Sequence, residues 1–104
     1  MSAKIYRMDT PHTMASLEKA VLDTIRANGF TACYIRPIMY RGYEALGVNP
    51  LTCPVGVAIL TWEWGKYLGD DALEKGVDVK VSSWRRMAPD TFPSLAKSSA
   101  NYAN

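Results

Sequence analysis

A near-continuous apolar run at residues 55–60 sets the strictest limit on how this chain folds. Five of its six residues are apolar, and the sixth is Gly56. A short run of this kind, rich in β-branched residues, is typical of a strand that is buried on both faces. We therefore expect residues 55–62 to form such a strand.

Hydrophobic spacing predicts further elements on both sides of this strand. Apolar residues recur at helical spacing over residues 13–28, where Thr13 is a suitable cap and Gly29 a suitable left-handed stop. Further along, residues 72–75 are expected to form a short helix. Three valines alternate with polar residues at 77–82, which predicts a half-exposed strand with its valines inward.

Residues 31–40 are aromatic and β-branched in character and predict another strand. Pro37 removes a ladder donor, which favours an edge strand or a bulge. Alternation along the strand puts Tyr34, Arg36 and Ile38 on one face, and the opposite face is uniformly apolar. We therefore expect the Arg36 face to look into a cleft.

Composition narrows the class of protein. The 104 residues carry a net charge of +2, with 48% hydrophobic and 21% charged residues, which is typical of a soluble globular protein. Charges of both signs are interspersed, which argues against nucleic-acid binding. No signal peptide or membrane span is visible, so we expect a cytoplasmic protein. Cys33 and Cys53 are interpreted as small buried residues, and no metal site is expected.

Lys97 is the candidate reactive side chain. It lies among small residues, with Tyr102 five positions further on and no acid or base beside it. Most lysines stay solvated because burying an ammonium group is costly. The alternative is an amine that loses its proton on desolvation and attacks an aldehyde cofactor. Local spacing alone leaves both readings open.

Six blocks of sequence, taken in order, resemble branched-chain amino acid aminotransferases, which are pyridoxal phosphate enzymes of fold type IV. The blocks are Ser-Ala-Lys-Ile-Tyr-Arg-Met at 2–8, Cys-Tyr-Ile-Arg-Pro at 33–37, Leu-Gly-Val-Asn-Pro at 46–50, Trp-Glu-Trp-Gly-Lys-Tyr-Leu-Gly at 62–69, Val-Ser-Ser-Trp-Arg-Arg-Met-Ala-Pro-Asp-Thr-Phe-Pro at 81–93 and Ala-Lys-Ser-Ser-Ala-Asn-Tyr at 96–102. One block alone is a weak signal, but six in order are specific.

The resemblance implies an α/β (α+β) fold that is an internal fragment of a two-domain enzyme. Residues 1–62 correspond to part of the small N-terminal α/β domain, 63–69 to the interdomain linker, and 70–104 to the start of the larger C-terminal cofactor-binding domain. The arginine and loops that hold the cofactor phosphate in this family fall outside the chain. We therefore expect the fragment to be inactive by itself.

The resemblance also implies roles for two residues near the end of the chain. Lys97 matches the lysine that attaches pyridoxal 5'-phosphate and carries a substrate proton. Tyr102 matches the tyrosine that contacts the cofactor's phenolic oxygen. Between these two residues the chain differs from the family, since it has Ser99 and Ala100 where the family commonly has Gly-Gly. The added Cβ atoms are expected to crowd a cofactor that approaches the backbone closely there.

Four further residues match substrate-binding positions. Arg36 matches the arginine associated with the substrate carboxylate, a group that suits its planar fork of donors. Tyr34 and Tyr67 match residues lining the side-chain pocket, with Trp64 beside it. Without the resemblance, these aromatic residues would be read as ordinary core.

The implied reaction is transfer of the amino group between L-leucine, L-isoleucine or L-valine and 2-oxoglutarate, by an enzyme that is a homo-oligomer. D-amino acid aminotransferase and aminodeoxychorismate lyase share the lysine and are alternatives within the same fold family. An alternative of another class is a non-catalytic remnant or association module. The blocks quoted above favour the branched-chain enzymes.

Overall fold

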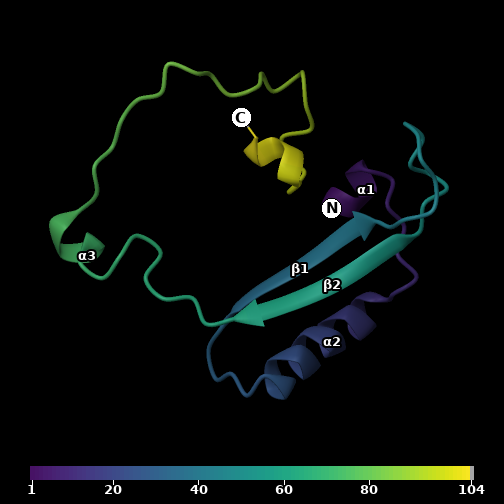
Figure 1. Cartoon of the computed structure of the whole chain (residues 1–104), viewed down its shortest axis with the longest axis horizontal. Helices are drawn as coiled ribbons and strands as arrows, with labels where there is room; N and C mark the ends of the chain where they lie inside the picture. The colour runs from purple at the N-terminus through teal and green to yellow at the C-terminus, as the bar shows by residue number, and fades with distance from the viewer. Residues whose placement is uncertain (104) are drawn as a thin grey trace. The chain divides into compact units, whose positions relative to one another are not determined.

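The computed structural model describes residues 1–103. Its elements, shown in Figure 1, are α1 (Ser2–Ile5), α2 (Met14–Ala27), β1 (Tyr34–Arg41), β2 (Val55–Trp62), α3 (Ala72–Lys75) and a 3₁₀ helix, Ser99–Tyr102. The chain forms two compact units. Unit 2 is Arg7–Trp64, and unit 1 combines Met1–Tyr6 with residues 65–103. This division falls inside the expected 63–69 linker, although residues 1–6 group with the later part of the chain. Assignment of the units to the two domains of an enzyme stays a prediction.

In unit 2, β1 and β2 form a two-stranded antiparallel sheet. Strand β2 has the predicted bounds. Strand β1 begins at Tyr34, three residues later than expected, because residues 31 and 32 form a bend. Pro37 lies opposite Ile59 within the pairing. A strand with one neighbour has an unpaired edge, which accommodates a residue without an N–H.

Helix α2 confirms the predicted helix and its start and stop residues. The Thr13 hydroxyl accepts a hydrogen bond from the Ser16 N–H at 3.1 Å, and Gly29 follows the C-cap with a φ of 68°. These are the expected N-cap and left-handed stop. No helix within residues 1–103 combines the length and apolar character needed to cross a bilayer.

Helix α2 packs on one face of the sheet (Figure 1). A groove of about 300 Å³ between them is lined by α2 side chains together with Val57 and Ile59. These two residues pair with Met39 and Pro37, so α2 covers the face opposite Arg36. Within unit 2, α2 thus leaves the Arg36 face uncovered, and the expectation that this face looks into a cleft stays a prediction.

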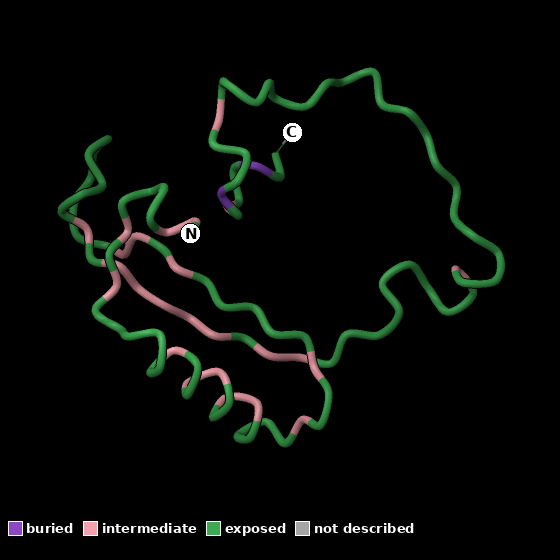
Figure 2. Tube along the Cα trace, turned by 180° about the vertical axis from the view of Figure 1, so that it is seen from behind, coloured by how far each residue is buried: buried purple, intermediate pink, exposed green. Residues whose placement is uncertain are grey.

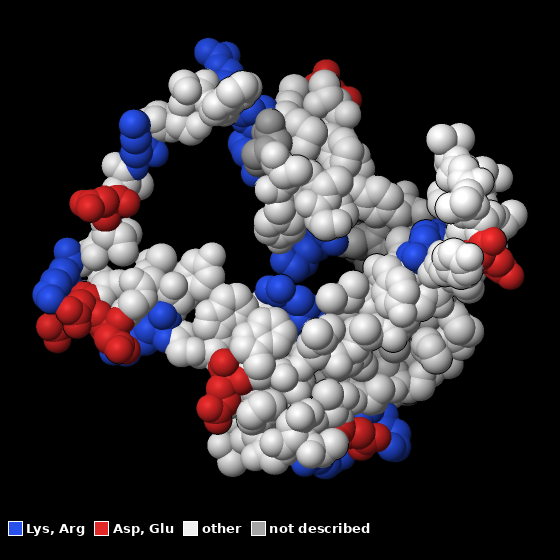
Figure 3. All heavy atoms as spheres, in the orientation of Figure 1, with Lys and Arg blue, Asp and Glu red and all other residues white. Residues whose placement is uncertain are grey.

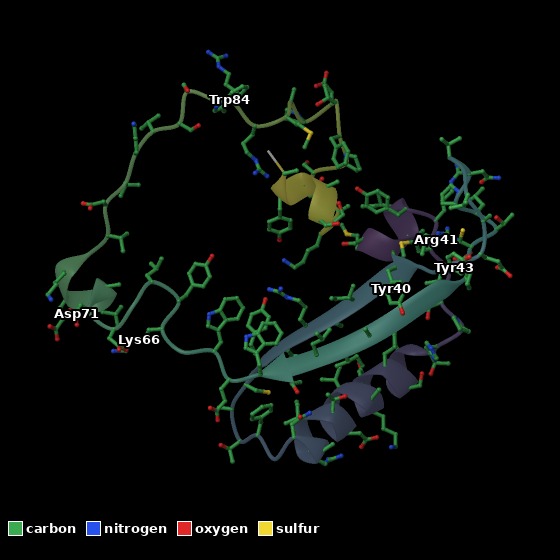
Figure 4. The ribbon with its side chains drawn as sticks, in the orientation of Figure 1. Tyr40, Arg41, Tyr43, Lys66, Asp71 and Trp84 are labelled. Carbon is green, nitrogen blue, oxygen red and sulfur yellow. The ribbon has the colours of Figure 1, made fainter. Side chains whose placement is uncertain are left out.

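Two local features stabilise the end of the sheet that contains Tyr40 and Arg41 (Figure 4). A Cβ added to Gly56 would lie 2.5 Å from the ring of Tyr40, so glycine lets this ring cross the neighbouring strand. Arg41 donates hydrogen bonds to the carbonyl oxygens of Cys53, at 3.2 Å, and Arg7, at 2.5 Å. The first bond ties β1 to the loop before β2, and the second ties it to the segment before α2.

Unit 1 contains little regular structure. Its buried positions are Ala96, 2% exposed, and Asn101, 9% exposed, which appear as the two purple stretches near the C-terminus in Figure 2. Helix α3 covers the predicted residues 72–75, and Gly76 follows it with a φ of 73°. Asp71 occupies its N-cap position, but the carboxylate binds Lys75 instead of capping the backbone.

Two predictions about strands are wrong. Residues 77–82 form no strand, and Val79 and Val81 are 90% and 93% exposed. An alternating apolar and polar pattern forms a half-buried strand only if another strand pairs with it. Among the described residues, no strand pairs with residues 77–82. Strand β2 is half-buried along most of its length, not buried on both faces, because only α2 covers the two-stranded sheet within unit 2.

Charged side chains of opposite sign lie next to one another around α3 (Figure 3). Lys75 pairs with Asp71 at 2.5 Å, and Lys66 lies 3.7 Å from Asp70. Figure 4 shows Lys66 and Asp71 in this same region. All four side chains are largely exposed, and exposed pairs of this kind contribute at most about 1 kcal/mol. They do not fix the fold.

The exposed surface predicts that the 104-residue chain self-associates or fails to unfold cooperatively. Within residues 1–103 the sole buried hydrophobic residue is Ala96, and the apolar side chains of Leu46, Val48 and Val81 are more than 90% exposed. Sedimentation velocity over a range of concentrations and differential scanning calorimetry measure the two outcomes. A monodisperse monomer with a sharp unfolding transition would contradict the prediction.

Candidate functional site

A tight turn places Lys97 beside Tyr102 in unit 1. Residues 93–96 form a turn closed by a 2.9 Å hydrogen bond from the Ala96 N–H to the Pro93 carbonyl. Ser98 is extended and starts the 3₁₀ helix that brings Tyr102 back toward the lysine. The Lys97 Nζ donates to the Tyr102 hydroxyl at 2.6 Å, so the structure brings these two predicted residues together.

The lysine segment is also bonded to the start of the chain. The Lys97 N–H donates to the Ser2 hydroxyl oxygen at 2.8 Å, and the hydroxyls of Tyr6 and Ser98 lie 2.9 Å apart. These bonds join residues more than ninety positions apart within unit 1. Sequence reasoning missed Ser2 and Tyr6, because no local pattern relates them to Lys97, although both lie in the first quoted block.

The backbone at the Gly-Gly departure has an ordinary conformation. Among residues 1–103, Arg7 is the sole non-glycine residue with a positive φ. Ser99 and Ala100 therefore occupy the 3₁₀ helix without the strain that a left-handed position would cause. Glycine is not required there by backbone geometry.

A second cluster lies on the uncovered face of the sheet in unit 2. The ring centroids of Tyr34 and Trp62 are 4.7 Å apart, those of Tyr34 and Trp64 are 4.4 Å apart, and those of Trp62 and Trp64 are 5.5 Å apart. The Arg36 guanidinium carbon lies 5.1–5.9 Å from all three ring centroids. The structure thus brings Tyr34, Arg36 and Trp64 together, and their role in binding a substrate stays a prediction.

The register of the sheet explains how this cluster forms. Tyr34 lies directly opposite Trp62, and Arg36 lies two positions further along the same face. A guanidinium over aromatic rings gains about 0.5–1 kcal/mol per exposed contact. The Arg36 Nη2 donates one hydrogen bond to the Tyr34 hydroxyl at 3.4 Å, and the other N–H groups of a guanidinium form a planar fork that suits an anion. The cluster therefore suits a planar anion such as a carboxylate. Trp62 has the shortest ring distance to Arg36, and sequence reasoning did not assign it to the site.

Tyr67 is the remaining predicted pocket residue. It belongs to unit 1, in the segment between β2 and α3, and 78% of its surface is exposed. The structure therefore does not group it with Tyr34 and Trp64, which belong to unit 2. Its role in a side-chain pocket stays a prediction.

Replacing Ser2 by alanine is expected to speed hydrogen exchange at the Lys97 amide by about two- to tenfold, the equivalent of one net hydrogen bond. The Ser2 hydroxyl accepts from this amide at 2.8 Å. Amide exchange followed by NMR on the isotopically labelled chain measures the rate. Ser16→Ala, in the other unit, is the matched control and should leave it unchanged. Equal rates in S2A and the unsubstituted chain would show that this bond does not order the lysine segment.

No family model matches the chain. Individual relatives do match. The chain is 47% identical to the branched-chain-amino-acid aminotransferase of Escherichia coli strain K12, over 97% of this chain and 33% of that protein. It is 34% identical to the branched-chain-amino-acid aminotransferase of Pseudomonas aeruginosa, over 99% of this chain and 34% of that protein.

A solved structure shares the fold as well. The crystal structure of the Escherichia coli branched-chain amino acid aminotransferase matches 98% of this chain with a TM-score of 0.91 and 46% identity, and the match covers 34% of that chain. The chain thus spans about a third of the length of the relatives it matches. In sequence and in fold, this chain is homologous to a segment of the fold type IV branched-chain-amino-acid aminotransferases.

Proposed function

We propose that this chain forms part of an aminotransferase that exchanges an amino group between a branched-chain L-amino acid and 2-oxoglutarate. The observation that supports it most is the pairing of the Lys97 Nζ with the Tyr102 hydroxyl at 2.6 Å. The pair lies in a segment that is homologous to aminotransferases throughout. Because the chain covers a third of those proteins, the complete activity requires sequence beyond it.

The family relationship implies a cofactor, and pyridoxal 5'-phosphate fits the residues present. An amine with a phenol beside it is the donor set that an aldehyde with a neighbouring phenolic oxygen requires. Ser99 and Ala100 lack the positive φ angles that would strain the backbone, so this segment does not need the family's Gly-Gly to place Lys97 beside Tyr102. When bound, the cofactor acts as an electron sink that makes the proton on the substrate Cα removable.

The residues of this chain have separate tasks in the proposal. Lys97 supplies the amine for covalent attachment and afterwards holds and returns the substrate proton at Nζ. Tyr102 donates its O–H to the cofactor's oxygen. The Lys97 side chain is exposed within the described residues, so the water exclusion that favours a neutral amine is not supplied by them.

The cluster on β1 and β2 supports the substrate assignment. Arg36 binds a substrate carboxylate, and the rings of Tyr34 and Trp64 pack against its guanidinium. The same two rings line the apolar pocket for the substrate side chain. A role for Tyr67 in the side-chain pocket is part of the same proposal and is supported by the family resemblance alone. A site with one fixed carboxylate anchor and an aromatic wall suits a branched apolar side chain in one half-reaction and an oxo acid in the other.

A full-length hybrid tests the proposed function directly. Residues 1–104 replace the matching third of the Escherichia coli relative, and amino transfer to 2-oxoglutarate is measured with L-leucine, L-valine and a D-amino acid. We expect turnover of the L-substrates, and Lys97→Ala should lower it by at least about 10²–10⁴-fold because the proton-transfer group is lost. Lys75→Ala, which removes an exposed lysine paired with Asp71, is the matched control and should change little. Activity on the D-substrate alone would reject the assignment.

The isolated chain is predicted to form no stoichiometric complex with pyridoxal phosphate and to show no turnover. By the resemblance, the family's phosphate-binding arginine and loops are expected to lie outside residues 1–104, and each charge-assisted hydrogen bond to phosphate contributes about 1.5–3 kcal/mol. Loss of several such bonds together weakens binding by several powers of ten. Borohydride trapping followed by peptide mass mapping measures the outcome. One equivalent fixed at Lys97, with Lys4, Lys19, Lys66, Lys75 and Lys80 unmodified, would contradict the prediction.

A further inference from the structure

The two buried residues of the described chain flank Lys97 in sequence. Ala96 immediately precedes it, and Asn101 immediately precedes Tyr102. Every other residue in positions 1–103 is half-buried or exposed. The one place where these residues pack tightly is therefore the segment that carries the lysine and the tyrosine.

Asn101 is the centre of the hydrogen bonds in that segment. Its side-chain Nδ2 donates to the carbonyl oxygen of Ala96 and, at 3.4 Å, to that of Pro93. Its own backbone carbonyl accepts from an Arg86 guanidinium N–H at 3.1 Å. One asparagine thus links the turn before Lys97, the helix after it and a residue fifteen positions upstream.

The chemistry of these partners fixes the orientation of the amide. Both acceptors of Nδ2 are carbonyl oxygens, so rotating the amide by 180° would put oxygen against oxygen. The Oδ1 atom, in turn, is buried and has no hydrogen-bond donor among residues 1–103. The segment keeps this orientation although it leaves one acceptor unpaired, which indicates that the two donor bonds control the geometry.

We propose that Asn101 is a positioning residue that sets the distance between the Lys97 Nζ and the Tyr102 hydroxyl. The Ala96 carbonyl that it binds lies one peptide from Lys97, and Asn101 itself lies one peptide from Tyr102. Its side chain therefore closes the loop between the two functional residues. This inference rests on the proposed function, in which Lys97 and Tyr102 bind the cofactor.

Asn101→Asp is the sharpest variant for this inference. It keeps the size of the side chain but replaces both N–H donors by oxygen, which faces the carbonyl oxygens of Ala96 and Pro93. Ser94→Asp is the matched control, because it adds the same charge to an exposed position of the same turn. Arg86→Gln is a second variant, which shortens the donor to the Asn101 backbone and leaves the asparagine side chain intact.

The test uses the full-length hybrid, loaded with pyridoxal phosphate, reduced with borohydride and mapped by peptide mass. The share of cofactor fixed at Lys97, relative to the other five lysines of the segment, is the readout that does not depend on turnover. We expect this share and kcat to fall by about 10–100-fold in N101D, as for a misplacement of about 1 Å, with KM for the amino acid changed much less. R86Q should show a smaller loss, and S94D should match the unsubstituted hybrid.

Circular dichroism and sedimentation establish which variants are folded. A folded N101D protein with an unchanged share at Lys97 overturns the inference and leaves the proposed function intact. If N101D does not fold, Asn101→Ala takes its place, because it removes the same two N–H donors without adding a charge, and an unchanged share in folded N101A overturns the inference in the same way. Failure of the unsubstituted hybrid to fix cofactor at Lys97 rejects the proposed function, and the inference with it.

Discussion

The antiparallel register of β1 and β2 decides which side chains of unit 2 meet. It sets Tyr34 opposite Trp62 and puts Arg36 on the same face, so three rings and one guanidinium gather there. A slip by one residue would send Arg36 to the face that α2 covers, because side chains alternate along a strand. The same register supplies Val57 and Ile59 to α2 on the other face. Packing and a candidate binding surface therefore depend on one set of strand pairs.

Unit 1 is organised by hydrogen bonds more than by apolar burial. Ser2 and Tyr6 bond to Lys97 and Ser98, while Asn101 bonds to the turn before the lysine. Each bond contributes about 0.5–1.5 kcal/mol net, so a few of them do not replace a hydrophobic core. They do, however, fix directions, which apolar contacts alone do not. This explains how unit 1, which has two buried residues among those described, holds an amine and a phenol 2.6 Å apart.

Elements whose signals are local were predictable from the sequence. Helix α2 follows from Thr13, the apolar spacing and Gly29, and the bounds of β2 follow from its apolar run. The strand predicted from the valines at 77–82 does not form, because a strand also needs a partner strand, which a local pattern does not reveal. Resemblance located Lys97 and Tyr102, but neither spacing nor resemblance pointed to Asn101. Its importance comes from carbonyl oxygens that turn toward it only in the folded segment.

The Arg36 cluster of unit 2 and the Lys97–Tyr102 pair of unit 1 differ in how complete each is by itself. The Arg36 cluster has its aromatic support within unit 2, so its geometry is complete once the two strands pair. Lys97 has its partner and its backbone anchors, yet its side chain is exposed within residues 1–103. A neutral, reactive amine is favoured where water is excluded. For the chemistry proposed for Lys97, the described residues of unit 1 therefore supply the position of the amine, but they do not supply the exclusion of water around it.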